Sequence, residues 1–461
     1  MNGNPLSLEE AAAHFVVDFE SDHIDERALT SAKSLFKDQL AIQIGASQLP
    51  WSRQVRQSRR LKVGNATIVG EATTADATDA AYLNATYGHG FEYDDFAGNA
   101  HPGCCVVPTA LAVGDEVGAT LGQALLAMVV GYEIYVRIGY LGSPDLLNAG
   151  WQPHSVLANF GAAAVAAKLY RVDESTAFHA LAIALSHASG TTEYASTGGS
   201  IKRAHAGFSV RNGIESVDLA RQGVTGPLRF LTGDRGLYRT FIRKVVGDNE
   251  ASIFALDQPL KISELSFKPY CSCAATHPYI DAMTTLQRSA ADIDSVVANI
   301  QTMADAIVGN RNANIYKPHN IEEVQYSLPV QMALAALGAG NGYRTHRTLL
   351  QGNPPVAPES EVIQLARKIS LHVSETLDRE YPRGFVADVT VTYRDGSTEH
   401  LFRKAAKGTP GNPMTLEEHG AKLDDLTRDV VGKDRADELW SVIDGMDYDA
   451  PVSSVTSLLR F

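Results

Sequence analysis

The sequence has few cysteines, no excess of basic residues and no long apolar run. Among its 461 residues the cysteines are only two close pairs, Cys104 with Cys105 and Cys271 with Cys273. Two such pairs in so long a chain do not form the disulfide framework of small secreted domains. The formal net charge of −13 argues against a general nucleic-acid binder, because phosphate neutralisation requires clustered lysine and arginine.

Segments for targeting and membrane insertion are also missing. The N-terminus lacks a basic region followed by an apolar stretch, so no signal peptide is expected. The longest apolar run, Ala124 to Tyr132, stops at Glu133 and falls well short of the roughly 20 residues that span a bilayer. We therefore expect a cytoplasmic protein that binds neither a membrane nor nucleic acid.

Sequence motifs for common cofactors are absent as well. The chain has no phosphate-binding P-loop, no dinucleotide fingerprint, no H-E-x-x-H zinc motif and no nucleophile elbow. Cys271 and Cys273 precede His277, but their C-x-C spacing differs from the usual C-x₂₋₄-C of zinc sites. We expect neither an organic cofactor nor a metal ion.

The first half of the sequence has the pattern of a helical bundle. Ser7 and Glu10 form a capping box before the run Ala11 to Val17. A second helix is expected over residues 25–44, with Gly45 ending it. Similar periodicity predicts three more helices, over Thr120–Ile138, Ser155–Tyr170 and Glu174–Ser186.

The pattern changes near residue 262. Strands are expected over Asn299–Val308, Ile369–Val373, Val386–Tyr393 and Thr398–Phe402, and Asp395-Gly396 between the last two is a strong hairpin signal. Helical periodicity returns from Thr415. The sequence therefore predicts a mainly α protein with an inserted α/β domain. Residues 1–262 and 405–461 would form a large helical domain from both chain ends, and residues 263–404 a smaller α/β lid domain.

An acidic segment is the first candidate for chemistry. Between Gly88 and Gly103 it concentrates Glu92, Asp94, Asp95, His89 and His101. Crowded carboxylates beside imidazoles shift pKa values toward neutrality, as acid–base catalysis requires. A solvated acidic loop is an equally good interpretation of the residues alone.

A glycine-rich turn at residues 197–199 leads into a helix whose first turn carries Lys202, Arg203 and His205. Helix N-termini hold anions, and the same dipole disfavours a lysine cation. We expect a lowered pKa for Lys202, which would make it a base or a carboxylate clamp. The alternative is a pair of surface charges.

Two later segments could form a second wall of the same pocket. Lys268 and His277 flank Cys271 and Cys273, and Tyr316 lies in a loop further on. A core histidine with buried thiols is the competing interpretation. A loop tyrosine is more often a packing group than a proton donor.

The order of these segments resembles the MmgE/PrpD family. The likeness covers about residues 8 to 450 and rests on Glu92-Tyr-Asp-Asp-Phe, His101-Pro, Gly150-Trp, Lys202-Arg and Lys268-Pro-Tyr with His277. The family includes 2-methylcitrate dehydratase, cis-aconitate decarboxylase and iminodisuccinate epimerase. The resemblance implies a cofactor-independent homodimer whose site lies between a helical and an α/β domain and acts on a small polycarboxylate.

Carried over by motif, the resemblance assigns catalytic roles to Glu92, His101, Lys202 and His277, and less securely to Tyr316. We expect the substrate-binding residues to be Arg203, His205, Gln152, His154, Lys268 and Asp95. One departure matters, because the decarboxylases have a histidine where this chain has Gln152, with His154 two residues later. If decarboxylation needs that histidine, this chain catalyses another reaction.

These observations predict an acid–base enzyme. Lys202, Arg203 and their helix terminus would hold carboxylates, His101 or Lys202 would remove a proton α to one of them, and His277 or Tyr316 would protonate the leaving group. We expect a dehydratase-type lyase first and an epimerase second, with a decarboxylase discounted by Gln152. A catalytically silent binding protein on the same scaffold is the non-enzyme alternative.

Overall fold

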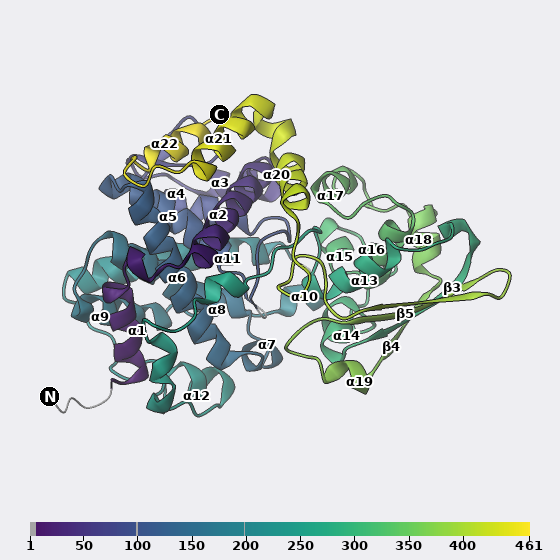
Figure 1. Ribbon diagram of the computed structural model, residues 1–461, viewed down its shortest axis with the longest axis horizontal. Coiled ribbons are helices and arrows are strands. Elements are labelled where there is room, and N and C mark those ends of the chain that lie inside the picture. Colours follow the sequence, from purple (N-terminus) through teal and green to yellow (C-terminus); the bar gives the residue numbers. More distant parts are fainter. Residues whose placement is uncertain (1–5, 98–99, 198) are drawn as a thin grey trace.

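The computed structural model describes residues 6–97, 100–197 and 199–461. It has two lobes, a large helical one and a smaller one with a four-stranded sheet (Figure 1). The protein is therefore mainly α with an inserted α/β domain, as the sequence predicts. Met1–Pro5, Gly98, Asn99 and Gly198 lie outside the described residues, so part of the acidic segment and of the glycine-rich turn is not described.

The helical domain is built from the N-terminal half of the chain and the C-terminal helices. Its elements are α1 Leu8–Asp18, α2 Glu26–Ser47, α3 Pro50–Ser58, α4 Ala77–Gly88, α5 Gly103–Val117, α6 Leu121–Gly142, α7 Asp145–Asn148, α8 Pro153–Leu169, α9 Glu174–Leu185, α10 Glu193–Thr197, α11 Ile201–Arg221, α12 Leu237–Ile242, α20 Leu416–Val431, α21 Lys433–Asp444 and α22 Ser453–Thr456, with the short pair β1 Ala66–Thr67 and β2 Thr74–Ala75. The predicted capping box is confirmed, since Glu10 N donates to Ser7 Oγ and Ser7 N to Glu10 Oε2.

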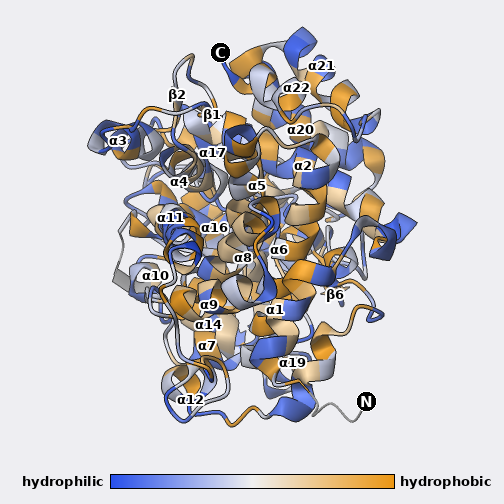
Figure 2. Cartoon of the chain, turned by 90° about the vertical axis from the view of Figure 1, so that its left-hand side faces the viewer, coloured by the Kyte–Doolittle hydropathy of each residue, from blue (hydrophilic) through white to orange (hydrophobic). Residues whose placement is uncertain are grey.

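The centre of this domain is the packing of α5, α6, α8 and α11. Small residues permit the close approach, because a Cβ on Gly131 of α6 would lie 2.4 Å from the side chain of Val165 on α8. Figure 2 shows apolar colour dense around α5, α6 and α8, with more of the hydrophilic colour on outer helices such as α3. The helices that carry site residues therefore stand on a rigid core.

Helix α6 is long and apolar enough to cross a membrane by length and composition alone. However, 83% of its most apolar window is buried inside the protein. Its Glu133 pairs with Arg137 at 2.6 Å, and both side chains are buried. α6 is therefore a core helix of the bundle.

The end expected for the second helix is wrong. Helix α2 continues through Gly45 to Ser47, and a Cβ at Gly45 would lie 2.9 Å from the carbonyl oxygen of Leu426 on α20. Gly45 thus permits a close helix crossing instead of ending the helix. This crossing brings the C-terminal helix α20 onto the N-terminal helix α2.

The smaller domain contains β3 Ile293–Ile300, β4 Ile369–Val373, β5 Ala387–Tyr393 and β6 Thr398–Arg403, in the sheet order β4-β3-β5-β6. β3 pairs parallel with β4 and antiparallel with β5, and the β5–β6 hairpin turns at Asp395-Gly396 as predicted. Its helices are α13 His277–Met283, α14 Thr302–Val308, α15 Ile321–Gln325, α16 Leu328–Ala336, α17 Tyr343–Leu349, α18 Glu361–Ala366 and α19 Glu375–Asp378. The domain boundaries expected at residues 262 and 405 stay predictions.

The strand expected over residues 299–308 is mostly wrong. β3 ends at Ile300, and α14 follows it. Asp378 accepts hydrogen bonds from both Thr302 N and Thr302 Oγ1 at 2.7 Å. A carboxylate from 76 residues away therefore starts this helix, which the local sequence does not reveal.

Candidate active site

A cleft of about 570 Å³ opens between the two domains, a volume typical of small-molecule sites. The helical domain lines it with Glu92, His101, Gln152, Tyr194 and Lys202. The smaller domain lines it with Lys268, Cys273, Thr302, Arg311, Tyr326, Asp378, Tyr381 and Phe385. Both domains therefore contribute polar groups to one cavity.

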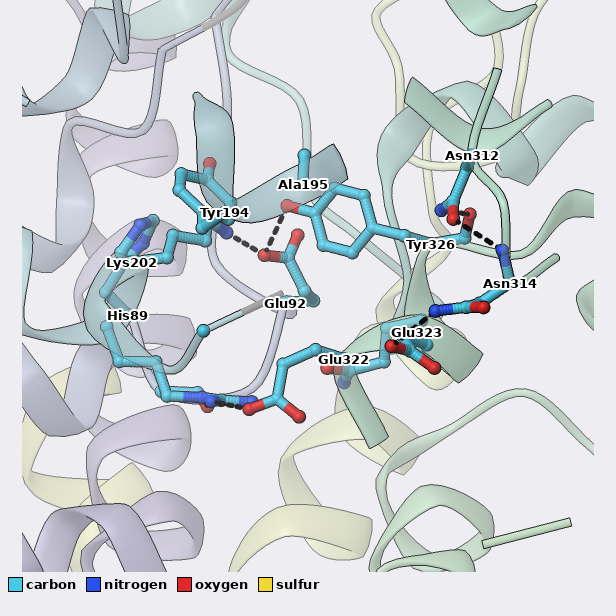
Figure 3. A pocket seen from close by; sticks show the side chains of 14 residues that line it. His89, Glu92, Tyr194, Ala195, Lys202, Asn312, Asn314, Glu322, Glu323 and Tyr326 are labelled. Carbon is cyan, nitrogen blue, oxygen red and sulfur yellow. Dashed lines mark hydrogen bonds and ion pairs between the residues drawn. The ribbon is translucent and has the colours of Figure 1, made fainter. Parts of the chain in front are cut away.

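The Glu92 carboxylate is where the two walls meet. It forms an ion pair with Lys202 from α11, and Lys268 Nζ lies 3.1 Å from its Oε2. Tyr326 donates a hydrogen bond of 2.9 Å to Oε1, and Figure 3 shows the Lys202 and Tyr326 side chains converging on Glu92. Three segments far apart in the chain thus hold one carboxylate.

Lys202 is almost fully buried, with 6% of the residue exposed. Burial lowers the pKa of Lys202 well below its usual value, and the charges of Lys268 and Arg203 lower it further. The sequence predicts a lowered pKa for Lys202 because of the helix dipole. The pKa is lowered, but burial is the largest cause. Lys202 stands in the first turn of α11, where the sequence places it.

His101 is held in one orientation by the acidic segment. Its Nδ1 donates to the carbonyl oxygen of Asp95 at 3.0 Å and lies 3.5 Å from Asp94 Oδ2. A proton on Nδ1 leaves Nε2 free to accept another. Burial lowers the pKa of His101 to about 4, although Asp94 opposes that shift. His101 is therefore a neutral imidazole at pH 7, the form a base requires.

Three buried side chains behind His101 could offer ligand atoms to a metal ion. The ligand atoms of His89, Cys104 and His154 lie within 4.8 Å of one another. However, the rings of His89 and His154 are stacked, with centroids 4.6 Å apart and planes at 26°. Nearly parallel rings do not direct their in-plane lone pairs at one point, and His89 Nδ1 already bonds Asp94 at 2.7 Å. This group does not fit a tetrahedral metal site.

Asp94 is central to that buried group. Burial would raise its pKa, but the neighbouring His89 and His101 hold the pKa of Asp94 well below its usual range. Its Oδ2 faces the Nδ1 atoms of both imidazoles, at 2.7 and 3.5 Å. The carboxylate is thus placed to orient His101 as a base.

The structure places the other predicted residues in two groups. Gln152 lines the cleft, and its Nε2 donates to the Tyr194 hydroxyl at 3.2 Å. Arg203 lies beside the cleft, stacked over Trp51 and paired with Glu322, and it lines a second cavity of about 30 Å³. That space suits a single water molecule.

Besides Arg203, five predicted residues do not line the cleft. Asp95 accepts a hydrogen bond from Gly103 N, His154 Nδ1 lies 3.1 Å from the Tyr135 hydroxyl, and His205 packs near Tyr194. The acid roles predicted for His277 and Tyr316 do not fit their positions. His277 Nε2 donates to the Ser272 carbonyl oxygen at 3.2 Å. The Tyr316 hydroxyl donates to the Ile369 carbonyl oxygen at 2.9 Å.

Sequence reasoning missed Asp94, Tyr194, Tyr326 and Arg311 as site residues. Asp94 belongs to the acidic segment already singled out, and Tyr326 follows Gln325 in a motif near Tyr316. The contact between Tyr326 and Glu92 joins residues 234 positions apart. Arg311 has no local signal in the sequence.

Comparisons with known proteins cover nearly the whole chain. The family model described as the MmgE/PrpD N-terminal domain matches residues 10–246, and the MmgE/PrpD C-terminal domain matches residues 270–447. A cis-aconitate decarboxylase of Aspergillus terreus is 26% identical over 466 residues, which cover 97% of this chain and 94% of the relative. The cis-aconitate decarboxylases of Mus musculus and Homo sapiens are each 23% identical, covering 98% of this chain and 93% and 95% of their own lengths.

Proposed function

We propose a function from the premise that this chain belongs to the MmgE/PrpD family, since the two family models together match most of its length. The relatives named above are cis-aconitate decarboxylases, and we infer a lyase of the same family type for this chain. The proposed activity is the cofactor-independent removal of a proton α to a carboxylate on a small di- or tricarboxylate, followed by loss of water. The observation that carries the proposal is the convergence of neutral His101 and two lysines on one cleft.

Substrate binding uses the cations of the cleft. Glu92 contacts both Lys202 and Lys268 and thereby positions their amino groups, each of which keeps further N–H donors for a substrate carboxylate. Arg311 lines the opposite wall, where its planar guanidinium suits a second carboxylate. These cations allow a protein with a net charge of −13 to bind an anionic substrate.

His101 removes the proton. Its Nδ1–H stays bonded to the Asp95 carbonyl, and Nε2 takes the proton from the carbon next to a substrate carboxylate. Negative charge then develops on that carboxylate as an enediolate. Lys202 and Lys268 are placed to stabilise this charge, because they are buried beside the position where it forms.

Loss of water requires a proton for the departing hydroxyl. Tyr326 supplies it, since its hydroxyl lies in the cleft and already donates to Glu92 at 2.9 Å. The electron pair of the enediolate forms the carbon–carbon double bond as the C–O bond breaks. Water and an unsaturated carboxylate leave, and the proton held by His101 passes through solvent to the Tyr326 phenolate, which restores both groups.

Decarboxylation is the second candidate, because the most similar relatives named above are cis-aconitate decarboxylases. The side chain that follows Trp151 into the cleft is Gln152, whereas His154 packs against His89 in the interior. If decarboxylation needs an imidazole at the position after Trp151, this chain has the Gln152 amide there instead. Epimerisation, which returns the proton to the opposite face, and silent ligand binding are the remaining alternatives.

Proton NMR in deuterium oxide distinguishes these outcomes on a panel of hydroxylated and unsaturated di- and tricarboxylates. A dehydratase produces an alkene signal from a hydroxylated substrate, an epimerase exchanges the α-hydrogen without net loss, and a decarboxylase converts the substrate into a product with one carboxylate fewer and new C–H signals. The Lys202→Ala protein is the control for adventitious catalysis. Absence of both exchange and turnover across the panel contradicts an enzymatic function.

Assembly and location belong to the same proposal. We infer a homodimer from the family resemblance, and light scattering behind size-exclusion chromatography tests it. A monomer mass of about 49.6 kDa at micromolar concentration contradicts the dimer. The cytoplasm is the proposed compartment, and fractionation of the source cells tests that.

A further inference from the structure

Side chains from four distant helices bind the backbone of the segment that carries Glu92. Each donates to a different carbonyl oxygen between residues 88 and 93. The bonds are Gln39 Nε2 to Gly88 at 3.2 Å, Arg203 Nε to Gly90 at 2.9 Å, Gln325 Nε2 to Phe91 at 3.1 Å and Lys422 Nζ to Tyr93 at 3.0 Å. All four donors are buried, with at most 5% of the residue exposed. We call this set the carbonyl clamp.

Glu92 has a backbone conformation that needs such support. Its φ is +56°, in the left-handed region that residues with a Cβ rarely adopt. A strained residue of this kind persists only where its surroundings fix it from several sides. The carbonyl clamp holds the Phe91 carbonyl before Glu92 and the Tyr93 carbonyl after it.

The smaller domain contributes to the clamp through two consecutive residues. Gln325, the last residue of α15, binds the Phe91 carbonyl, and Tyr326 binds the Glu92 carboxylate itself. The backbone and side chain of Glu92 are therefore both tied to one point of the α/β domain. Docking of that domain and placement of the carboxylate depend on the same contacts.

We propose that Gln325 is a positioning residue that holds Glu92 in its left-handed conformation and thereby makes the Lys202–Glu92 pair depend on docking of the smaller domain. This inference rests on the proposed function for its catalytic consequence. Gln325 does not line the main cleft, so it acts through Glu92. Arg203 and Lys422 support the same segment from the helical domain.

Gln325 is the best position for a test. It is uncharged, and its side chain bonds the Phe91 carbonyl through Nε2, whereas its Oε1 has no partner among the described residues. Lys422 is less suitable because it also pairs with Asp38 at 2.7 Å, so its removal leaves a buried carboxylate. Gln325→Leu removes the donor with little change in volume.

The first measurement is a double-mutant cycle with Glu92→Gln. We expect Gln325→Leu alone to lower kcat about 10²-fold, with KM changed less than about threefold, because misplacement of a catalytic group by ~1 Å has this order of effect. In the double variant we expect no loss beyond that of Glu92→Gln alone, since both changes act through one carboxylate. If the double variant instead loses the product of the two single losses in kcat, the inference is overturned and the proposed function stays intact.

Gln331→Leu is the matched control. Gln331 is a buried amide of the neighbouring helix α16 that donates to the Val324 carbonyl at 2.9 Å and also bonds His346 and Asn341, none of which belongs to residues 88–93. We expect its effect on kcat to stay within about threefold. If its loss matches that of Gln325→Leu, loosening of the domain explains both, and the inference is overturned.

Crystal structures of the wild-type and Gln325→Leu proteins give a readout that does not depend on turnover. In the variant we expect Glu92 to leave the left-handed region and its carboxylate to move away from Lys202. An unchanged Glu92 overturns the inference. If Gln325→Leu does not fold, Gln325→Met, which is unbranched and adaptable, replaces it in both measurements. An inactive wild-type protein with the expected movement of Glu92 contradicts the proposed function alone.

Discussion

The two walls of the cleft differ in how their residues are supported. On the helical side, Lys202 stands on a 21-residue helix packed into the bundle core, and His101 immediately precedes α5. On the other side, Lys268, Arg311 and Tyr326 all lie in connections between short elements. The helical wall, which carries the proposed base His101, is therefore the better supported one.

This difference suggests a division of labour. A base and an ammonium group must be held within fractions of an ångström of the reacting carbon, and long packed helices provide that precision. Recognition of the outer part of a substrate tolerates more movement, which connecting segments allow. We therefore expect substitutions of Lys202 and His101 on the helical wall to reduce kcat and substitution of Arg311 on the α/β wall to act mainly on KM. Tyr326, the proton donor, is the exception on the α/β wall.

The largest effect is expected on the helical wall. Lys202→Ala and His101→Ala should each lower kcat/KM by about 10³-fold, within the range for loss of a positioned acid–base group. Steady-state kinetics on folded protein, checked by circular dichroism, measures this. The exposed Lys62 provides the control Lys62→Ala, and normal turnover by both site variants would show that the chemistry lies elsewhere.

A smaller effect is expected for the tyrosine of the α/β wall. Tyr326→Phe should lower kcat by roughly 10–10²-fold, because it removes both the donor to Glu92 and the proton for the leaving group. Tyr316→Phe is the matched control and should change kcat less than twofold, since its hydroxyl binds the Ile369 carbonyl. A larger fall in kcat for Tyr316→Phe than for Tyr326→Phe would support the catalytic role that the family resemblance gives to Tyr316.

Arg311→Gln should raise KM by about tenfold and leave kcat within twofold, because a charge-assisted hydrogen bond to substrate contributes ~1.5 kcal/mol or more. The effect should be larger for tricarboxylates than for dicarboxylates. Arg288, at the β5–β6 hairpin, provides the control Arg288→Gln. A fall in kcat with constant KM would contradict the division between the walls.

The smallest effect concerns pH and stability. Burial lowers the pKa of His101 to about 4 and that of His277 to about 3, against 6.5 in the unfolded chain. The unfolded state therefore binds more protons as the pH falls from 6.5 to about 4, and the free energy of unfolding decreases by up to ~1.4 kcal/mol per unit for each histidine. Urea denaturation at pH 7.5, 6.0 and 5.0 measures this slope, and His277→Gln should reduce it. If the free energy of unfolding of His277→Gln depends on pH as steeply as that of the wild type, groups other than His277 cause the loss of stability at low pH.

Local signals predicted much of the fold. The capping box at Ser7 and the turn at Asp395-Gly396 are found as expected, because each acts within a few residues. The two errors came from distant contacts. Gly45 was mistaken for a helix end, although its lack of a side chain serves the approach of α20. Residues 302–308 are helical because Asp378 caps them from elsewhere in the chain.

The candidate site shows the same limit. Segments rich in titratable groups identified Glu92, His101 and Lys202, and the structure brings all three to one cleft. Tyr326 and Arg311 could not be found in this way, because their importance arises from the docking of two domains. His277 and Tyr316 carry suitable chemical groups, but local sequence does not show which way a side chain points.

The crossing of α2 and α20 at Gly45 also has a consequence for biosynthesis. The partner of α2 begins at Leu416, so it emerges from the ribosome after the whole α/β segment. Until then a nascent chain exposes the face of α2 that carries Asp38, the carboxylate later covered by Lys422. The helical domain can close only after translation has passed the segment inserted into it.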